Sequence, residues 1–122
     1  MKLHHGCNDP KSVFAAIAKS KRGEPALNGS FHVAPKKSVA KNYGKYLISF
    51  LMAADVAGAH VGMINKDGNM NSAVGNEIEV VMSSHDSKVD FASKVVGAEV
   101  LCPDGRLVIM DVNNGKILSV AS

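Results

Sequence analysis

The sequence predicts an α+β fold in a single domain covering residues 1–122, with helices early in the chain and strands late. A helix start at Asp9-Pro10 is the clearest signal in the first third. The last third carries three apolar segments separated by two glycine-containing turns, "PDG" and "NNG". Strands and helices do not alternate regularly, which argues against a parallel sheet built from strand–helix–strand units.

Residues 9–23 carry the signals of a complete amphipathic helix. Asp9 suits the N-cap, and Pro10 suits the first helical position because that position needs no N–H. Apolar residues then recur with the helical period, at Val13, Phe14, Ile17 and Ala18. The segment "KSKRG" ends the helix with cations and a glycine, which the helix dipole and the C-cap both favour.

The next segments give weaker signals. "SFHVA" (30–34) predicts a short strand, and a second helix is expected from Pro35 to a stop at Gly44. "KYLISFLMAADVAG" (45–58) fits either a helix or a buried strand, because periodicity does not separate the two for a short apolar run.

The second half is predicted to be mostly strands. We expect a polar loop with an Asp-Gly turn over 64–76, a strand over 77–83, and a loop or one helical turn, with Asp86 or Ser87 near its start, over 83–97. The C-terminal segments predict an antiparallel meander of three strands, 98–102, 106–112 and 116–120.

Composition excludes several classes of protein. Hydrophobic residues make up 46% and charged residues 20%, as in ordinary globular proteins, and the net charge of +3 is far from that of a dedicated nucleic-acid binder. The chain has no apolar run of about 18 residues and no signal-peptide pattern, so we expect a cytoplasmic protein without a membrane partner. Cys7 and Cys102 are expected to be reduced thiols. Five histidines lack any metal-ligand spacing, so no metal is expected: His4, His5, His32, His60 and His85.

Three short motifs, taken together and in order, point to a function. "LHHG" ends a first predicted strand, "GSFHVA" leads through a helix to "AKNYG", and "GAEVL" carries Glu99 on a late strand. In this order the chain resembles the ADP-ribosyltransferase superfamily, in the His-Tyr-Glu branch that includes poly(ADP-ribose) polymerases and diphtheria toxin. The resemblance implies two packed, mainly antiparallel sheets with flanking helices.

The resemblance also implies a reaction. A mono-ADP-ribosyltransferase would cleave NAD, its substrate, between nicotinamide and ribose. It would pass ADP-ribose to a protein or nucleic-acid acceptor, with water as a side acceptor. Such a small chain suits a toxin or phage effector, acting then in the host cytoplasm. The acceptor and the oligomeric state are left open.

The resemblance assigns roles to particular residues. Glu99 would stabilise the oxocarbenium-like transition state, with Glu77 and Glu79 as alternatives because "NEIEV" also fits the family's active strand. The residues expected to bind NAD are His5, Gly6, Phe31, His32 and Tyr43. The two aromatic rings would sandwich nicotinamide, the glycine backbone would pair with its carboxamide, and the histidine before that glycine would bond a ribose hydroxyl. Because neighbouring strand residues alternate, His4 is expected to face away from this site.

The chain departs from the family pattern at three positions. Ala40 stands where a small serine often lies three residues before the second aromatic. Phe31 replaces the first tyrosine, which keeps stacking and loses a hydroxyl. Gly97 stands where arginine-specific transferases carry a second acidic residue, which argues against arginine as the acceptor. The competing hypothesis is a non-catalytic α+β binding or assembly protein with its aromatic residues in the core. A strand over 45–58 would complete the transferase sheet, whereas one long helix there would favour the competing hypothesis.

Overall fold

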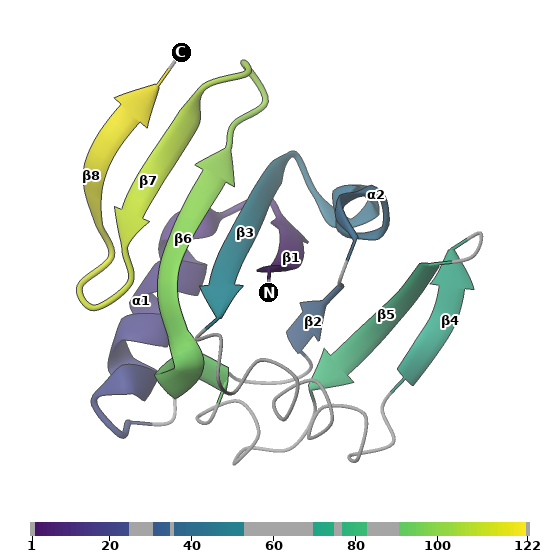
Figure 1. The fold of residues 1–122 in the computed structure, drawn as a ribbon, viewed down its shortest axis with the longest axis horizontal. Coiled ribbons are helices and arrows are strands. Elements are labelled where there is room, and N and C mark those ends of the chain that lie inside the picture. The colour runs from purple at the N-terminus through teal and green to yellow at the C-terminus, as the bar shows by residue number, and fades with distance from the viewer. Residues whose placement is uncertain are drawn as a thin grey trace.

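The structure is a computed structural model, and it describes residues 2–24, 31–34, 36–52, 70–74, 77–82 and 91–121. The described strands form two antiparallel sheets (Figure 1). One has the order β1-β3-β6-β7-β8, with strands Lys2–Cys7, Tyr46–Met52, Val95–Leu101, Leu107–Asp111 and Lys116–Ala121. The other has the order β2-β5-β4, with strands Phe31–Val33, Glu77–Met82 and Met70–Val74.

The two sheets meet where β1 lies beside the end of β2. His4 and Ala34 form an isolated antiparallel bridge, in which each backbone N–H donates to the other residue's carbonyl at 2.8 Å. This bridge places β2, and through it β5 and β4, next to the N-terminal strand of the larger sheet (Figure 1).

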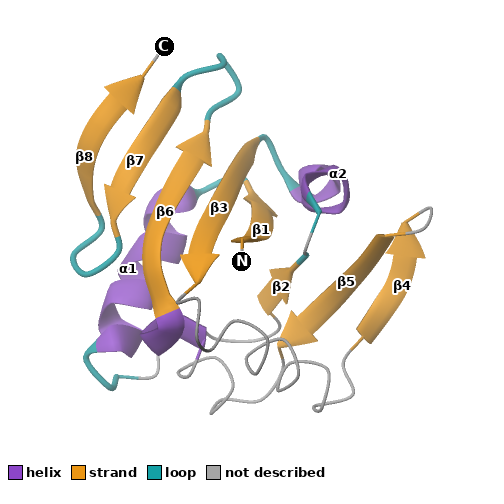
Figure 2. Ribbon diagram, viewed as in Figure 1, coloured by secondary structure: helices purple, strands orange, loops and turns teal. Residues whose placement is uncertain are grey.

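Helix α1 (Pro10–Lys21) lies across one face of the larger sheet (Figure 2). The Asp9 side chain caps it by accepting from the Ser12 backbone N–H, with Pro10 in the first turn. At its C-terminus Gly23 has a φ of +83°, a conformation that costs glycine little. The helix predicted from Asp9 to Gly23 is therefore confirmed, including both ends.

The main core lies between α1 and the sheet. Phe50 is fully buried at its centre and makes edge-to-face contacts with Phe14 of the helix and with Phe91, at centroid distances of 6.4 and 5.3 Å. A second, smaller cluster packs on the opposite face of the sheet, from Ala34, Val39, Ala40 and Leu47.

The second helix is shorter than expected. It begins at Lys37 rather than Pro35, as α2 (Lys37–Ala40), and tightens into the 3-10 helix η1 (Lys41–Tyr43) before the predicted stop at Gly44. The residue before the helix, Lys36, is extended, so the chain turns into the helix two positions later than the proline signal suggested.

The ambiguous apolar segment is resolved in favour of a strand. Tyr46–Met52 forms β3, which lies between β1 and β6, and residues 53–58 of that segment lie outside the described residues. A strand fits this position because pairing on both edges needs an extended backbone, and the alternation of a strand places Ile48, Phe50 and Met52 together in the core.

The other strand predictions have mixed outcomes. The C-terminal meander is confirmed as β6, β7 and β8, and the strand from Glu77 as β5. The loop predicted over 64–76 is wrong for Met70–Val74, which forms β4, because pairing with β5 outweighs the low strand propensity of its polar residues. The Asp-Gly turn, Asp86 and Ser87 lie outside the described residues; residues 91–94 form a helical turn.

The α+β prediction is therefore confirmed.

Both cysteines are free thiols. The strand β3 lies between them, because Cys7 is opposite Tyr46 on one side of β3 and Cys102 follows Leu101 of β6 on the other side. Two strand spacings place their Cα atoms about 10 Å apart, beyond the reach of a disulfide. No described helix has the length and apolar character needed to cross a membrane.

Candidate active site

The two faces of β1 carry different residues, and this decides where each histidine lies. Leu3 belongs to the α1-side core and Cys7 packs against it, so His5, which lies between them and opposite the core residue Ile48, shares that face. His4 lies on the other face, bonded to Ser49. His4 and His5 therefore lie on opposite faces of β1, as the alternation predicts, and it is His4 that shares the sheet face carrying Glu99.

His4, Ser49 and Glu99 form a row across three strands. Ser49 is opposite His4 on β1 and opposite Glu99 on β6. His4 Nδ1 and Ser49 Oγ are 2.8 Å apart, and both side chains are buried. Lys2 Nζ donates to Glu99 Oε1 at 3.2 Å, so the carboxylate of Glu99 is partly neutralised.

Burial lowers the pKa of His4 below its usual 6.5, and the positive charges of Lys37 and Lys2 lower it further, against the opposing effect of Glu99. A neutral imidazole is therefore favoured at pH 7, and it is suited to hydrogen bonding rather than to charge pairing. By contrast, burial raises the pKa of the Cys7 thiol to about 11, which favours the protonated thiol at pH 7.

Glu99 lines a shallow cavity of about 200 Å³. Its other lining residues are Lys2, Ser49, Leu51, Gly97, Ala98 and Ile109. No aromatic ring is among them, so within the described part of the chain Glu99 has no ring clamp for nicotinamide beside it. The structure does not bring Glu99 into a common cavity with Gly6 and Tyr43.

Gly6 and Tyr43 do lie together, at the end of β1. They border a depression of about 10 Å³, room for about one water molecule, together with His4, His5, Val33, Ala34 and Ala40. A Cβ on Gly6 would lie 1.9 Å from the Ala40 carbonyl oxygen and 3.3 Å from Tyr43 Cβ. Glycine is therefore required here because α2 and η1 pack directly against the strand.

The backbone of Gly6 has an unusual environment. His4 exchanges both of its backbone hydrogen bonds with Ala34, and alternate residues of an antiparallel strand direct these groups to the same edge. Gly6 therefore directs its N–H and C=O toward the β2 side of β1, where no described residue pairs with them. Gly6 is buried, and buried backbone groups are nearly always paired, so this edge is a candidate binding position.

The alternative glutamates lie on the strand that pairs with β2. Phe31 and His32 are opposite Met82 and Val81 of β5. Glu77 begins β5, and Glu79 directly precedes Val80, which is opposite Val33 of β2. His4 pairs with Ala34, the residue after β2, on one side and with Ser49 of β3 on the other, so β5 and β6 are each the second strand from β1.

The site contains residues that the sequence did not single out. Ser49 contacts His4 and Lys2 contacts Glu99. Nothing in the local sequence pattern identifies Ser49 or Lys2, because their partners depend on the register between distant strands.

The described residues contain no cluster of three His, Cys, Asp or Glu side chains arranged to hold a metal ion. No protein-family model, curated protein or solved structure matches the chain.

Proposed function

We propose that this protein is a mono-ADP-ribosyltransferase, which cleaves NAD at the bond between nicotinamide and ribose and transfers ADP-ribose to a protein or nucleic acid. The bond from the ribose anomeric carbon to the pyridinium nitrogen breaks, and its electron pair stays on nicotinamide. The acceptor's nucleophile bonds to the anomeric carbon and releases its proton to solvent. Water in place of the acceptor gives free ADP-ribose.

The observation that carries this proposal is the Gly6 edge. A primary carboxamide offers N–H donors and a C=O acceptor on the same group, which is the complement of a backbone C=O and N–H that no described residue pairs. Tyr43 is 43% exposed beside this edge, and an aromatic ring is the kind of group that stacks on a planar pyridine. The 10 Å³ depression is too small for the ring itself, so nicotinamide binds outside it, or η1 moves outward.

The direction of the Gly6 edge bears on the choice of carboxylate. A carboxamide bound there lies on the β2 side of β1, whereas Glu99 lies beyond β3 on the other side. This favours Glu77 and Glu79 on β5 over Glu99 as the group that stabilises the oxocarbenium-like transition state. The ion pair with Lys2 also reduces the charge that Glu99 can offer to a cation.

His5, Phe31 and His32 remain proposed NAD contacts. His5 borders the same depression as Gly6 and Tyr43. Phe31 and His32 lie on β2, the strand next to this depression. Their proposed roles are ribose binding for His5 and stacking or edge contacts for the two β2 residues.

The decisive experiment measures nicotinamide release from NAD by chromatography, and transfer of labelled ADP-ribose to proteins and nucleic acids of a cell lysate. The variants are Glu77→Gln, Glu79→Gln and Glu99→Gln, with Glu24→Gln as a control on an exposed carboxylate. We expect one β5 variant to lose about a hundredfold or more of the rate, as with other groups that stabilise transition-state charge. The control should keep the wild-type rate.

Two outcomes would change the account. Loss confined to Glu99→Gln would return the catalytic role to Glu99. No release and no transfer at high protein concentration would reject the transferase and leave the binding or assembly protein. One long helix over 45–58 would have favoured the binding or assembly protein. Tyr46–Met52 forms strand β3 instead, so that argument does not apply.

A further inference from the structure

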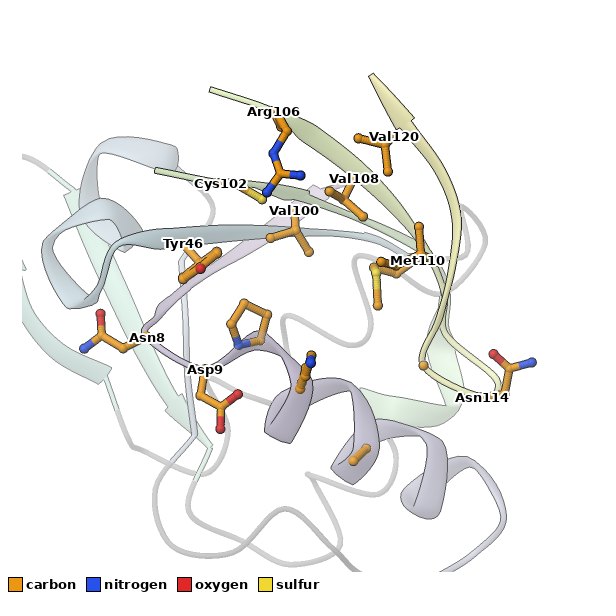
Figure 3. A pocket seen from close by; sticks show the side chains of 15 residues that line it. Asn8, Asp9, Tyr46, Val100, Cys102, Arg106, Val108, Met110, Asn114 and Val120 are labelled. Atoms are coloured by element: carbon orange, nitrogen blue, oxygen red, sulfur yellow. The ribbon is translucent and has the colours of Figure 1, made fainter. Parts of the chain in front are cut away.

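A cavity lies on the other face of the large sheet, away from the proposed active site. It has a volume of about 560 Å³ and lies between the first turns of α1 and the strands β6, β7 and β8 (Figure 3). Val100 and Val108 line it, and these alternate with Glu99 and Ile109, which face the opposite side. The cavity is therefore independent of the Gly6 edge and of the candidate glutamates.

The strands supply an apolar wall to this cavity. The apolar side chains include Val100, Val108, Met110 and Val120, and Tyr46 adds an aromatic ring (Figure 3). Ile117 of β8 also lines the cavity. Ile117 and Val120 are 61% and 53% exposed, which is high for apolar residues on a sheet face beside a hollow. A volume between about 300 and 1,000 Å³ with mainly apolar lining is typical of sites for small organic ligands.

The polar groups at the rim favour an anion. Asp9 is occupied by the Ser12 N–H and hydroxyl, Asn8 Oδ1 accepts from the Lys45 N–H, and Asn114 Oδ1 accepts from the Lys116 N–H. Arg106 binds Asp104 through Nε at 2.7 Å, and none of the described residues bonds its two terminal nitrogens.

Lys11 is the second cation of this rim. No described side chain bonds its ammonium group, although its charge helps to lower the pKa of Asp9 after the larger effect of Ser12. Of the charged residues that line the cavity, Lys11 and Arg106 are positive and Asp9 is negative, so the lining carries a net positive charge. This charge complements one negative group placed at the mouth of the cavity.

We propose that this cavity is a binding site for a small amphipathic anion, with an apolar ring system or chain against the strand residues and a carboxylate, sulfonate or similar group near Lys11 and Arg106. The ligand covers Ile117 and Val120, which accounts for apolar side chains left open on β8. This site goes beyond the proposed transferase reaction and does not depend on it.

The test uses two fluorescent probes with the same aromatic body. Anilinonaphthalene sulfonate carries a negative charge, and N-phenyl-1-naphthylamine is neutral. We expect saturable 1:1 binding of the sulfonate to the natively folded protein, checked by cooperative urea unfolding, because partly unfolded proteins also bind this dye. Arg106→Gln should weaken the sulfonate about two- to fivefold, as expected for an exposed charge pair, and leave the neutral probe unchanged.

A matched pair of variants locates the site. Val120→Asp should weaken both probes at least about tenfold, because it places a charge against the apolar wall. Val96→Asp alters a similarly exposed valine, 58% against 53%, outside the cavity and should leave binding unchanged.

Three outcomes overturn the proposal. The first is no saturable binding of the sulfonate to folded protein, and the second is an equal loss in the two aspartate variants. The third is a dimer that Val120→Asp dissociates while the wild type binds no probe, because that face would then be occupied by a second copy.

Discussion

The two faces of the five-stranded sheet differ in what alternate residues of the same strands provide. On the α1 face Ile48 and Phe50 of β3 are fully buried in an apolar core. On the opposite face Ser49 of the same strand bonds a buried histidine and lies opposite Glu99. Consecutive residues of one strand therefore differ in what they contribute, one to the packing of the core and the next to polar contacts. Substitutions one position apart should have different effects on the protein.

The largest effect should come from the core face. Phe50→Ala removes a fully buried ring that contacts Phe14 and Phe91, and it should cost about 3–5 kcal/mol of unfolding free energy. Leu51→Ala, one residue along and 44% exposed on the other face, should cost less than about 1 kcal/mol. Urea denaturation of both variants measures the difference, and equal losses would contradict the assignment of faces.

The next effect should come from the contact between β1 and α2. Gly6→Ala places a methyl group against the Ala40 carbonyl and should destabilise by about 1–3 kcal/mol or more. Gly97→Ala meets only Leu51 side-chain atoms at 3.9 and 4.0 Å, so it should change stability little. Thermal unfolding of the pair tests this, and a neutral Gly6→Ala would show that α2 does not pack against the strand.

The His4–Ser49 pair should contribute a smaller, pH-dependent amount. Ser49→Ala leaves His4 Nδ1 without its partner and should cost about 1–3 kcal/mol at pH 7. Because the folded pKa of His4 lies below 6.5, the unfolded chain binds the proton more readily, so stability from this residue is complete above pH 6.5 and is lost as the pH falls below it. His4→Gln should therefore flatten the decline in unfolding free energy between pH 7 and 5; an unchanged slope would refute the shift.

The smallest effect should come from the exposed edge of that same face. Lys2→Gln breaks the 3.2 Å ion pair with Glu99, and a partly exposed pair of this kind is worth about 0–1 kcal/mol. The loss should shrink further at 1 M salt because ions screen the pair. Urea unfolding at low and high salt measures it. A salt-independent loss above about 1 kcal/mol would mean that Lys2 contributes mainly through packing.

Local signals predicted the parts of the fold that local interactions stabilise. Asp9, Pro10 and Gly23 mark both ends of α1 because caps act within one turn, and the two turns of the C-terminal meander act over similarly short distances. The strand β4 escaped prediction because its polar residues are extended through pairing with β5.

The candidate site could be predicted only in part for the same reason. The motif residues Gly6 and Tyr43 border one depression, and His4 and His5 alternate as predicted, but the sequence did not show that His4 shares a sheet face with Glu99. Ser49 and Lys2 contact His4 and Glu99 only because of the register between distant strands, and Lys2 and Glu99 are 97 residues apart in the sequence. The cavity beside Arg106 likewise depends on where α1 crosses the sheet, and no single segment encodes that position.

The account depends most on the backbone edge of Gly6, which no described residue pairs, and nitrogen-15 NMR of this amide tests it directly. We expect nicotinamide to shift the amide resonances of Gly6 and Tyr43 in a saturable way and to leave Gly97, on the same face of the sheet, unmoved. Nicotinate has the same ring without the amide N–H donor and should shift them much less. No shift at Gly6 with saturating nicotinamide, or equal shifts with nicotinate, would contradict the proposed binding edge.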